Sequence, residues 1–344
     1  MPRPTHILVI RLSALGDVAM TVPVLRLVVQ THPDVKLTVV SRRIHEPLFT
    51  DIPNVHFLEA DVYGKHKGLL GLLKLAKEAK LLGIDAVADL HNVIRSKNIT
   101  RFLRIQGIRS VTIDKGRAEK RKLVNAKGMG LIKLKSTHQR YADVFERLEL
   151  PIDLSIGIFP DRKPLNPRLY ALIGAAPKKC IGIAPFAAYK GKMYPLKMMK
   201  EVLTHLEETQ LYRVLLFGGG KEEIEQLKEL ESQFSSVTNV GGALTFTEEL
   251  DLISNLDLMI SMDSANGHLA AIYGIPVITL WGVTHPYAGF IPYQQPDENQ
   301  LMSDRNQYPF IPTSVYGNKY PLDYEDVMQT IETKTVLDKI LELL

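Results

Sequence analysis

The stretch from Leu256 to Pro276, LDLMISMDSANGHLAAIYGIP, constrains the fold of this chain more than any other. It opens with an apolar run typical of a buried parallel strand, continues with a polar turn over Met262 to Asn266, and ends in a short helix over His268 to Tyr273. Gly274 ends that helix, because glycine readily adopts the left-handed conformation that follows a helix. A strand that leads through a turn into a helix directs backbone N–H groups to the carboxyl edge of a sheet. The stretch therefore predicts an anion-binding edge in an α/β protein.

The same order of strand, turn and helix recurs on both sides of one proline-rich segment. Before it, apolar strand candidates occur in HILVIRLSALGDVAMTVPVL, KLTVVSRR and LLGIDAVADLH; after it they occur in KKCIGIAPF, RVLLFGGG and VITLWG. The segment itself, residues 158–167 with sequence IFPDRKPLNP, holds three prolines and is typical of a linker. We therefore predict an α/β protein with two Rossmann-like, doubly wound parallel-sheet domains, residues 1–160 and 161–322, facing across a cleft. A C-terminal helix in residues 323–344 could pack back on the first domain.

Charge is distributed unequally between the two predicted domains. Residues 1–160 contain 26 Lys and Arg against 15 Asp and Glu, whereas residues 161–344 contain 16 against 23. The first domain is thus expected to meet an anionic partner, such as acidic lipid headgroups, an anionic glycan or a nucleic acid. A nucleic acid is the weakest of these, because the basic region lacks interleaved aromatic residues. Within that region, Lys115 to Lys135 shows little periodicity and is predicted to be a basic loop.

The composition is that of an ordinary globular protein, with 45% apolar and 23% charged residues. No run of eighteen apolar residues and no secretory leader is visible, and the single Cys180 precedes an apolar run where a buried, reduced thiol is expected. A cytoplasmic protein is therefore expected. The dinucleotide pattern G-x-G-x-x-G, the P-loop pattern, H-E-x-x-H and paired C-x-x-C are all absent, which disfavours NAD, P-loop and zinc chemistry.

Two of the strand-end turns carry carboxylates with more than one possible role. Asp17 follows Ser13 and Gly16 after the first strand; Ser13 or Asp17 could cap the next helix, or Asp17 could act as a general base. In the glycine-rich turn that begins near Gly218, Glu222 or the glutamate after it could accept hydrogen bonds from a ribose, or could simply stabilise the first turn of a helix.

The two other turns carry lysines and a convergent polar set. In APFAAYKGKMYP, Lys190 and Lys192 could neutralise a diphosphate, or could be solvated loop lysines. In the stretch described first, a carboxylate, a hydroxyl and an imidazole converge on one helix start, which favours a ligand-facing role over a purely structural one: Asp263, Ser264 and His268.

Several of these segments together resemble one family. RLSALGDVAMTVPVL, DLHNVIRS, HQRY, the K-x-Y-P motif at Lys192 to Pro195, FGGGKEE, and above all DSANGHLAA followed by YGIPVITLWG are similar to the bacterial heptosyltransferases of lipopolysaccharide inner-core synthesis, glycosyltransferase family nine. The resemblance covers nearly the whole chain, in order. It implies the two-domain GT-B fold, with an ADP-heptose donor held mainly by the second domain and an acceptor held by the first.

The resemblance also implies a role for particular residues. Asp17 would be the catalytic base, and no metal ligand is implied. The donor diphosphate and sugar would be bound by Lys192, Asp263, Ser264 and Ala265, with His268 beside them, and the nucleoside by Glu222 and Gly218. The acceptor would be bound by Ser13, Gly16, Arg95, Lys97 and Arg101. The chain departs from the family in having alanine at 265, where glycine is usual, and in lacking cysteines from Trp281 onward.

The expected function is an inverting transfer of heptose from ADP-heptose to a Kdo-lipid A acceptor. No cofactor would be required, with Mg²⁺ at most stimulating, and the protein would act as a monomer on the cytoplasmic face of the inner membrane, peripherally bound to the inner-leaflet surface. No nucleic-acid partner is expected. Two alternatives stay open from the residues alone: a nucleotide-sugar epimerase or hydrolase that shares the GT-B fold, and a non-catalytic nucleotide-sugar-binding protein.

Overall fold

The computed structural model describes residues 3–174 and 178–344, which form two compact units. The N-terminal unit comprises the chain up to Arg117 together with Lys135–Ile158, and the C-terminal unit comprises Ala118–Leu134 and Phe159–Leu344. The last passage from one unit to the other, between Ile158 and Phe159, thus falls in the proline-containing segment. Residues 118–134 group with the C-terminal unit and not, as the sequence predicts, with the first domain.

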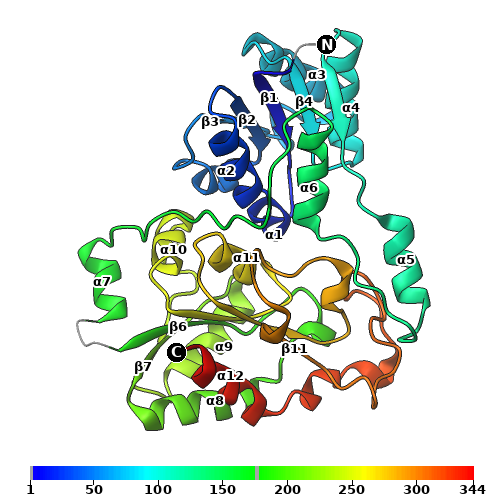
Figure 1. The fold of residues 1–344 in the computed structure, drawn as a ribbon. Coiled ribbons are helices and arrows are strands. Elements are labelled where there is room, and N and C mark those ends of the chain that lie inside the picture. Colours follow the sequence, from blue (N-terminus) through cyan, green and yellow to red (C-terminus); the bar gives the residue numbers. More distant parts are fainter. Residues whose placement is uncertain (1–2, 175–177) are drawn as a thin grey trace. The chain divides into compact units, whose positions relative to one another are not determined.

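The N-terminal unit is built on a five-stranded sheet in the order β3-β2-β1-β4-β5 (Figure 1). Every pairing in it is parallel. The central strand β1 is buried at all five positions, since apolar residues follow one another without the polar alternation of a half-exposed strand. The strands are β1 (His6–Ile10), β2 (Lys36–Ser41), β3 (Val55–Glu59), β4 (Ala86–Asp89) and β5 (Arg109–Thr112).

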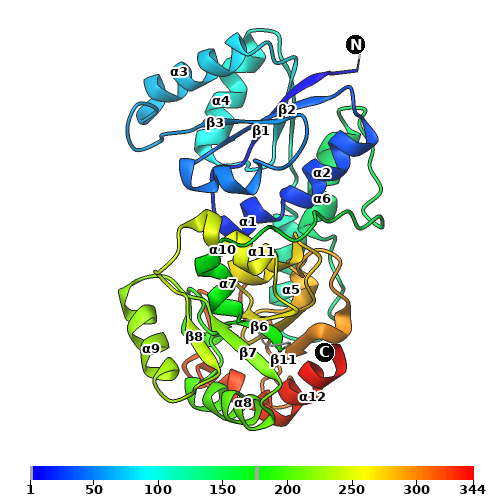
Figure 2. The ribbon, with the colours of Figure 1, turned by 90° about the vertical axis from the view of Figure 1, so that its left-hand side faces the viewer.

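Helices cover both faces of this sheet. Figure 2 shows the sheet with α3 and α4 on one side and α2 and α6 on the other. The short helix α1 follows the end of β1, and a 3₁₀ segment, η1 (Arg43–Leu48), follows β2. The helices are α1 (Leu15–Ala19), α2 (Val22–Thr31), α3 (Gly68–Leu81), α4 (Ile94–Ile105) and α6 (Thr137–Glu146).

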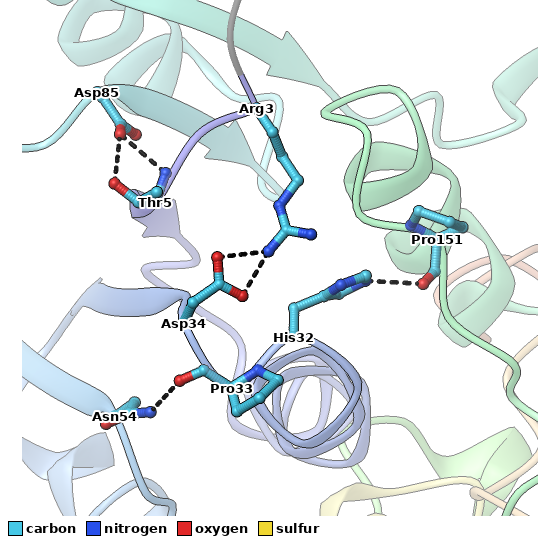
Figure 3. Close-up of polar contacts among 8 residues, drawn as sticks. All are labelled: Arg3, Thr5, His32, Pro33, Asp34, Asn54, Asp85 and Pro151. Atoms are coloured by element: carbon cyan, nitrogen blue, oxygen red, sulfur yellow. Dashed lines mark hydrogen bonds and ion pairs between the residues drawn. The ribbon is translucent and has the colours of Figure 1, made fainter.

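The amino edge of the N-terminal sheet is closed by side-chain contacts (Figure 3). Each contact joins the start of a strand, or the loop that leads into it, to a neighbouring segment. The pairs are Thr5 with Asp85, Arg3 with Asp34, Asn54 with the Pro33 carbonyl and His32 with the Pro151 carbonyl. These contacts tie the connections together at the amino edge, so the polar turns at the carboxyl edge are the candidates for a functional site in this unit.

The C-terminal unit contains a six-stranded sheet in the order β11-β10-β9-β6-β7-β8, again parallel at every pairing. The strands are β6 (Lys179–Ala184), β7 (Tyr212–Leu216), β8 (Val237–Asn239), β9 (Leu258–Met262), β10 (Val277–Trp281) and β11 (Gln300–Met302). Its helices are α5 (Arg117–Asn125), which begins at the passage between units, α7 (Pro167–Ile173), α8 (Leu196–Thr209), α9 (Lys221–Glu231), α10 (Phe246–Ile253), α11 (Ala265–Ala271) and α12 (Thr333–Leu343). Short 3₁₀ segments are η2 (Lys190–Lys192), η3 (Pro286–Ala288), η4 (Asp297–Asn299), η5 (Leu322–Tyr324) and η6 (Val327–Thr330).

The C-terminal helix α12 packs within the C-terminal unit. It contacts α8, and its Val336 and Ile340 are fully buried in the apolar core of that unit. This differs from the expectation that the helix packs back on the first domain, because the apolar face of α12 already has its partner in α8 and the core behind it.

The strand–turn–helix stretch forms as predicted, with shifted bounds. β9 and α11 are separated only by Asp263 and Ser264, and Gly274 has a positive φ of 73°. The helix starts at Ala265 because Ser264 has the extended backbone of an N-cap residue. The polar turn is therefore shorter than predicted, and Asp263 lies directly after the strand.

The segment predicted as a basic loop is partly helical and is bound to the C-terminal unit. The ammonium of Lys120 lies 3.9 Å from the ring centroid of Phe290, and Lys133 forms an ion pair of 2.7 Å with Asp297. The backbone N–H of Leu134 donates to the carbonyl of Tyr287 at 3.0 Å. The prediction of an unpacked loop was wrong, because these lysines meet an aromatic ring and a carboxylate that are distant in the sequence.

Candidate active site

Asp17 lies in α1, the short helix that follows β1 after the turn of residues 11–14. The N-cap of α1 is Ala14, and no side-chain hydrogen bond caps this helix, so neither Ser13 nor Asp17 serves as the cap. The Asp17 carboxylate instead forms an ion pair with Arg11, and 32% of its side chain remains exposed. Asp17 is thus held at the sheet edge while staying accessible to solvent.

Arg11 and Tyr141 hold Asp17 from two sides. The Arg11 side chain is nearly buried; it donates through Nη1 to the carbonyl of Leu90 at 2.9 Å, and its guanidinium carbon lies 6.0 Å from the centre of the Tyr141 ring. The Tyr141 hydroxyl donates to the backbone carbonyl of Asp17 at 3.1 Å. Burial raises the pKa of Tyr141 well above its usual value, so the hydroxyl keeps its proton and remains a donor.

The surroundings of Arg11 are strongly basic. Burial, reinforced by the neighbouring Arg11, lowers the pKa of Lys115 to about 8, although Asp17 acts in the opposite direction. Burial and the charges of Arg11, Lys115 and Arg95 lower the pKa of His91 to about 3. His91 is therefore neutral near pH 7, and its Nδ1 accepts a hydrogen bond from the Leu12 N–H at 3.3 Å.

The end of β4 contributes a buried carboxylate to the same edge. Oδ1 of Asp89 accepts the backbone N–H groups of His91 and Asn92, each at 2.9 Å. Oδ2 is buried without a hydrogen-bond partner among the described residues. The carboxylate thus shapes the turn between β4 and α4, which carries the next predicted residues.

The predicted acceptor residues divide into two groups. Ser13 and Gly16 lie in the same turn as Asp17. Arg95, Lys97 and Arg101 are exposed along α4, where Arg95 and Lys97 lie in the first turn and Arg101 lies about one turn further from the sheet edge. Arg95 lies 5.6 Å from the centre of the ring of Tyr63, an exposed residue in the loop after β3, and Arg42 lies 5.8 Å from the same ring.

In the C-terminal unit, Lys192 and Asp263 form the central pair. The Lys192 Nζ lies 3.0 Å from Oδ2 of Asp263, and each side chain is only 11% exposed. Thr284, which follows β10, donates its hydroxyl to the same oxygen at 2.9 Å. Gly317 has a positive φ of 81°, and a Cβ added there would lie 2.4 Å from Cδ of Lys192, so the glycine leaves room for the lysine.

The other predicted donor residues of this stretch follow Asp263 along the chain. Ser264 is the N-cap of α11 without a side-chain capping bond, Ala265 is the first helical residue, and His268 is buried in the same helix. Ala265 has no positive φ, so alanine fits its backbone without strain. The replacement of the family's usual glycine therefore costs no backbone energy here.

The glycine-rich turn borders a cleft of ≈ 490 Å³ within the C-terminal unit. The cleft lies at the carboxyl ends of β6 and β7, and its lining includes Phe186, Lys190 and Glu222. Glu223 also borders it, but its Oε2 accepts the backbone N–H of Gly219 at 2.9 Å and so closes the turn. This leaves Glu222 as the glutamate of the turn suited to a ligand.

Gly218 has a packing reason of its own. A Cβ at this position would lie 2.9 Å from Cδ1 of Leu227 and 3.4 Å from a ring carbon of Phe186. Gly218 therefore brings the backbone of the turn close to α9 and to the wall of the cleft. Lys192 is not among the residues that line the cleft, whereas its neighbours Lys190 and Met193 are.

Among residues 3–174 and 178–344, no three or more His, Cys, Asp or Glu side chains are grouped so that they could hold a metal ion. In the same part of the chain, no helix is both long and apolar enough to cross a membrane.

Three residues of the site are not predicted from the sequence: Arg11, Tyr141 and Thr284. Each had a local signal: Arg11 and Thr284 come soon after buried strands, and Tyr141 lies in the HQRY segment. None of these signals identifies a partner, because the partner lies elsewhere in the sequence.

The chain has two α/β units, each built on a parallel sheet, and this is the GT-B fold of the solved heptosyltransferase structures that it resembles. The chain belongs to glycosyltransferase family 9, the heptosyltransferases, whose family model matches residues 72–318. It is therefore a glycosyltransferase.

Individual relatives are distant but nearly full-length. The lipopolysaccharide core heptosyltransferase OpsX of Haemophilus influenzae is 22% identical over 295 residues, which cover 82% of this chain and 80% of the relative. A family 9 glycosyltransferase from Veillonella parvula has a similar structure, with a TM-score of 0.75 at 19% identity over 98% of this chain and 97% of the other. The E. coli heptosyltransferase WaaC, solved with ADP, has a TM-score of 0.68 at 17% identity over 99% of this chain and 100% of the other. These structures support the two-sheet fold.

Proposed function

We propose that this chain transfers heptose from ADP-heptose to an anionic inner-core acceptor, Kdo-lipid A, with inversion at the anomeric carbon. The observation that carries the proposal is Asp17, a partly exposed carboxylate held at the carboxyl end of β1 by Arg11 and Tyr141. Family membership and the ADP in the similar E. coli enzyme support an ADP-linked donor. The excess of basic residues in residues 1–160 supports an anionic acceptor.

In the proposed reaction, Asp17 accepts the proton of an acceptor hydroxyl while the hydroxyl oxygen attacks the anomeric carbon. The new carbon–oxygen bond forms as the bond to the β-phosphate breaks, and ADP leaves with the electron pair. Lys192 stabilises the charge that develops on the leaving diphosphate, together with backbone N–H groups near Ser264 and Ala265. Asp263 orients the ammonium of Lys192 before the donor binds, and the hydroxyl of Thr284 holds the carboxylate of Asp263.

The remaining roles follow the same scheme. Glu222 and Gly218 face the nucleoside, and His268 lies beside the donor sugar. The acceptor is contacted by Ser13, Gly16, Arg95, Lys97 and Arg101. Because Lys192 and backbone amides supply positive charge to the diphosphate, the proposal includes no required metal, with Mg²⁺ at most stimulating. The enzyme would act as a monomer at the cytoplasmic surface of the inner membrane.

The donor is tested by thermal shift with ADP-, UDP-, GDP- and CMP-sugars. A bound donor at about 100 times its dissociation constant should stabilise the protein by about 2.7 kcal/mol, and only ADP-sugars should do so. The acceptor is tested by mass spectrometry of Kdo-lipid A after incubation with ADP-heptose. Stabilisation by UDP-sugars instead, or consumption of ADP-heptose that does not depend on acceptor, would contradict the proposal.

A further inference from the structure

Helices α3 and α4 lie side by side on one face of the N-terminal sheet (Figure 2). Their inward side chains belong to a single apolar core with β1, β2 and β4, and these side chains are Leu72, Leu75, Ala76 and Ala79 from α3 and Ile99 and Leu103 from α4. Because these residues bind each helix to the core, the opposite side of each helix is its outward side, away from the sheet.

The outward side of α3 combines apolar and basic residues. Leu70, Lys74, Lys77 and Leu81 follow one another at spacings that place them on one helical face, directly opposite the buried residues. Leu70 is 82% exposed and Leu81 is 87% exposed, and both lysines are exposed as well. A soluble helix rarely leaves its largest apolar side chains in this position without a partner.

The outward side of α4 has the same character. Ile94 is 80% exposed and Ile105 is 75% exposed, and the exposed Arg101 lies between them on the same face. Lys97 and Arg104 flank this row, and α4 contains no acidic residue.

The acidic content of the two helices is limited to one side chain. Glu78 of α3 lies 3.2 Å from Nε2 of His66 and 3.7 Å from Nζ of Lys65, so its charge is directed to the loop before α3 rather than to the outward face. The outward face of α3 and α4 is therefore basic and apolar at once. Two copies of it would repel each other, which disfavours self-association through this face.

We propose that the outward face of α3 and α4 docks on the surface of an anionic lipid bilayer. Leu70, Leu81, Ile94 and Ile105 enter the boundary between headgroups and acyl chains, while Lys74, Lys77 and Arg104 bind the acidic headgroups. The relevance of docking to catalysis rests on the proposed lipid-linked acceptor, but the docking itself depends only on the exposed side chains.

The experiment is sedimentation of the full chain with vesicles of phosphatidylcholine, with or without phosphatidylglycerol. The wild type should bind the anionic vesicles and be released by salt, because the attraction is screened. K74Q/K77Q should lower the partition coefficient by on the order of tenfold, given the known attraction of each basic side chain to an acidic surface. L81S/I105S should lower it similarly, since apolar burial is lost.

Matched control variants lie on exposed positions of the C-terminal unit. Lys197 and Lys200 of α8 repeat the spacing of Lys74 and Lys77, and Leu322 is 92% exposed. K197Q/K200Q and L322S should bind vesicles like the wild type. Equal binding by wild type, K74Q/K77Q and L81S/I105S would overturn the proposal, as would binding that is insensitive to phosphatidylglycerol. A lipid-free dimer that L81S/I105S dissociates would assign the face to self-association instead.

A second readout separates docking from the proposed function. K74Q/K77Q should transfer heptose to a delipidated, water-soluble acceptor at the wild-type rate, but should transfer more slowly to acceptor embedded in anionic vesicles. Absence of transfer by the wild type with either acceptor would refute the proposed function while leaving the vesicle result intact. If K74Q/K77Q and the wild type transferred heptose to embedded acceptor at equal rates, docking through this face would not contribute to catalysis.

Discussion

Arg11 and Asp17 form an ion pair across the turn that joins β1 to α1, with the arginine nearly buried and the aspartate partly exposed. The pair fixes a carboxylate at the carboxyl end of the central strand of the N-terminal sheet. The Tyr141 hydroxyl holds the backbone of the same aspartate, so that both its side chain and its main chain are restrained. Such a restraint suits a group that must meet a substrate hydroxyl in one orientation.

The first prediction concerns Asp17 itself. Asp17→Asn keeps the shape of the side chain but removes its ability to accept a proton, so kcat should fall by about 10²–10⁴-fold. Affinity for the ADP-sugar, measured by calorimetry, should stay within about twofold of the wild type. Turnover near the wild-type rate would show that Asp17 is not the base.

Arg11 is predicted to act through Asp17. Arg11→Lys keeps a positive charge but cannot bond the Leu90 carbonyl and the Asp17 carboxylate in the same planar geometry, so we expect kcat to fall about tenfold with KM for both substrates little changed. Arg11→Ala should lower kcat further and also destabilise the protein by about 1–3 kcal/mol, because the buried carbonyl loses its donor. Steady-state kinetics together with denaturant unfolding distinguish the two effects. A change in KM alone would indicate that Arg11 binds substrate directly.

Lys192 is predicted to bind the donor diphosphate. Lys192→Met removes the ammonium but keeps much of the aliphatic stem, so the affinity for ADP should fall at least tenfold, or about 1.4 kcal/mol. Thr284→Val serves as the comparison, because it removes only the hydroxyl bond to Asp263 and should weaken ADP binding less. Calorimetric titration with ADP measures both. Unchanged ADP affinity in Lys192→Met would exclude the diphosphate role.

The lowered pKa of His91 should make the free energy of unfolding depend on pH. Its pKa is lowered from 6.5 to about 3 in the folded protein, so between these values the unfolded chain binds more protons and acid favours unfolding. The free energy of unfolding should therefore decrease by up to about 1.4 kcal/mol for each pH unit below 6.5, until about pH 3. His91→Gln should lack this component, which appears as the difference between the urea unfolding curves of variant and wild type. Parallel pH profiles of the two proteins would contradict the assignment.

Much of the fold could be predicted because its signals are local. The apolar run of β9 and the helix end at Gly274 each depend on a few consecutive residues. Both sheets have the parallel pairing that was predicted. The assignment of residues 118–134 to the first domain was wrong because their partners lie far away in the sequence. The segment is predicted as a basic loop, whereas Lys120 contacts the ring of Phe290 and Lys133 pairs with Asp297.

The candidate site divides in the same way. Asp17, Lys192 and Asp263 could be selected from the sequence, since polar residues after parallel strands gather at the carboxyl edge of a sheet. The contacts that hold them, from Arg11, Tyr141 and Thr284, could not be selected, because no spacing in the chain relates these residues to their partners.

The sequence by itself determined the alternation of strands and helices, the position of the polar turns and the family to which the chain belongs, because each depends on short segments and their order. Only the tertiary structure decided that Arg11 neutralises Asp17, that Lys192 pairs with Asp263, and that residues 118–134 join the C-terminal unit. The physical reason is that ion pairs, cation–π contacts and buried hydrogen bonds depend on distances in space, which separation along the chain does not specify.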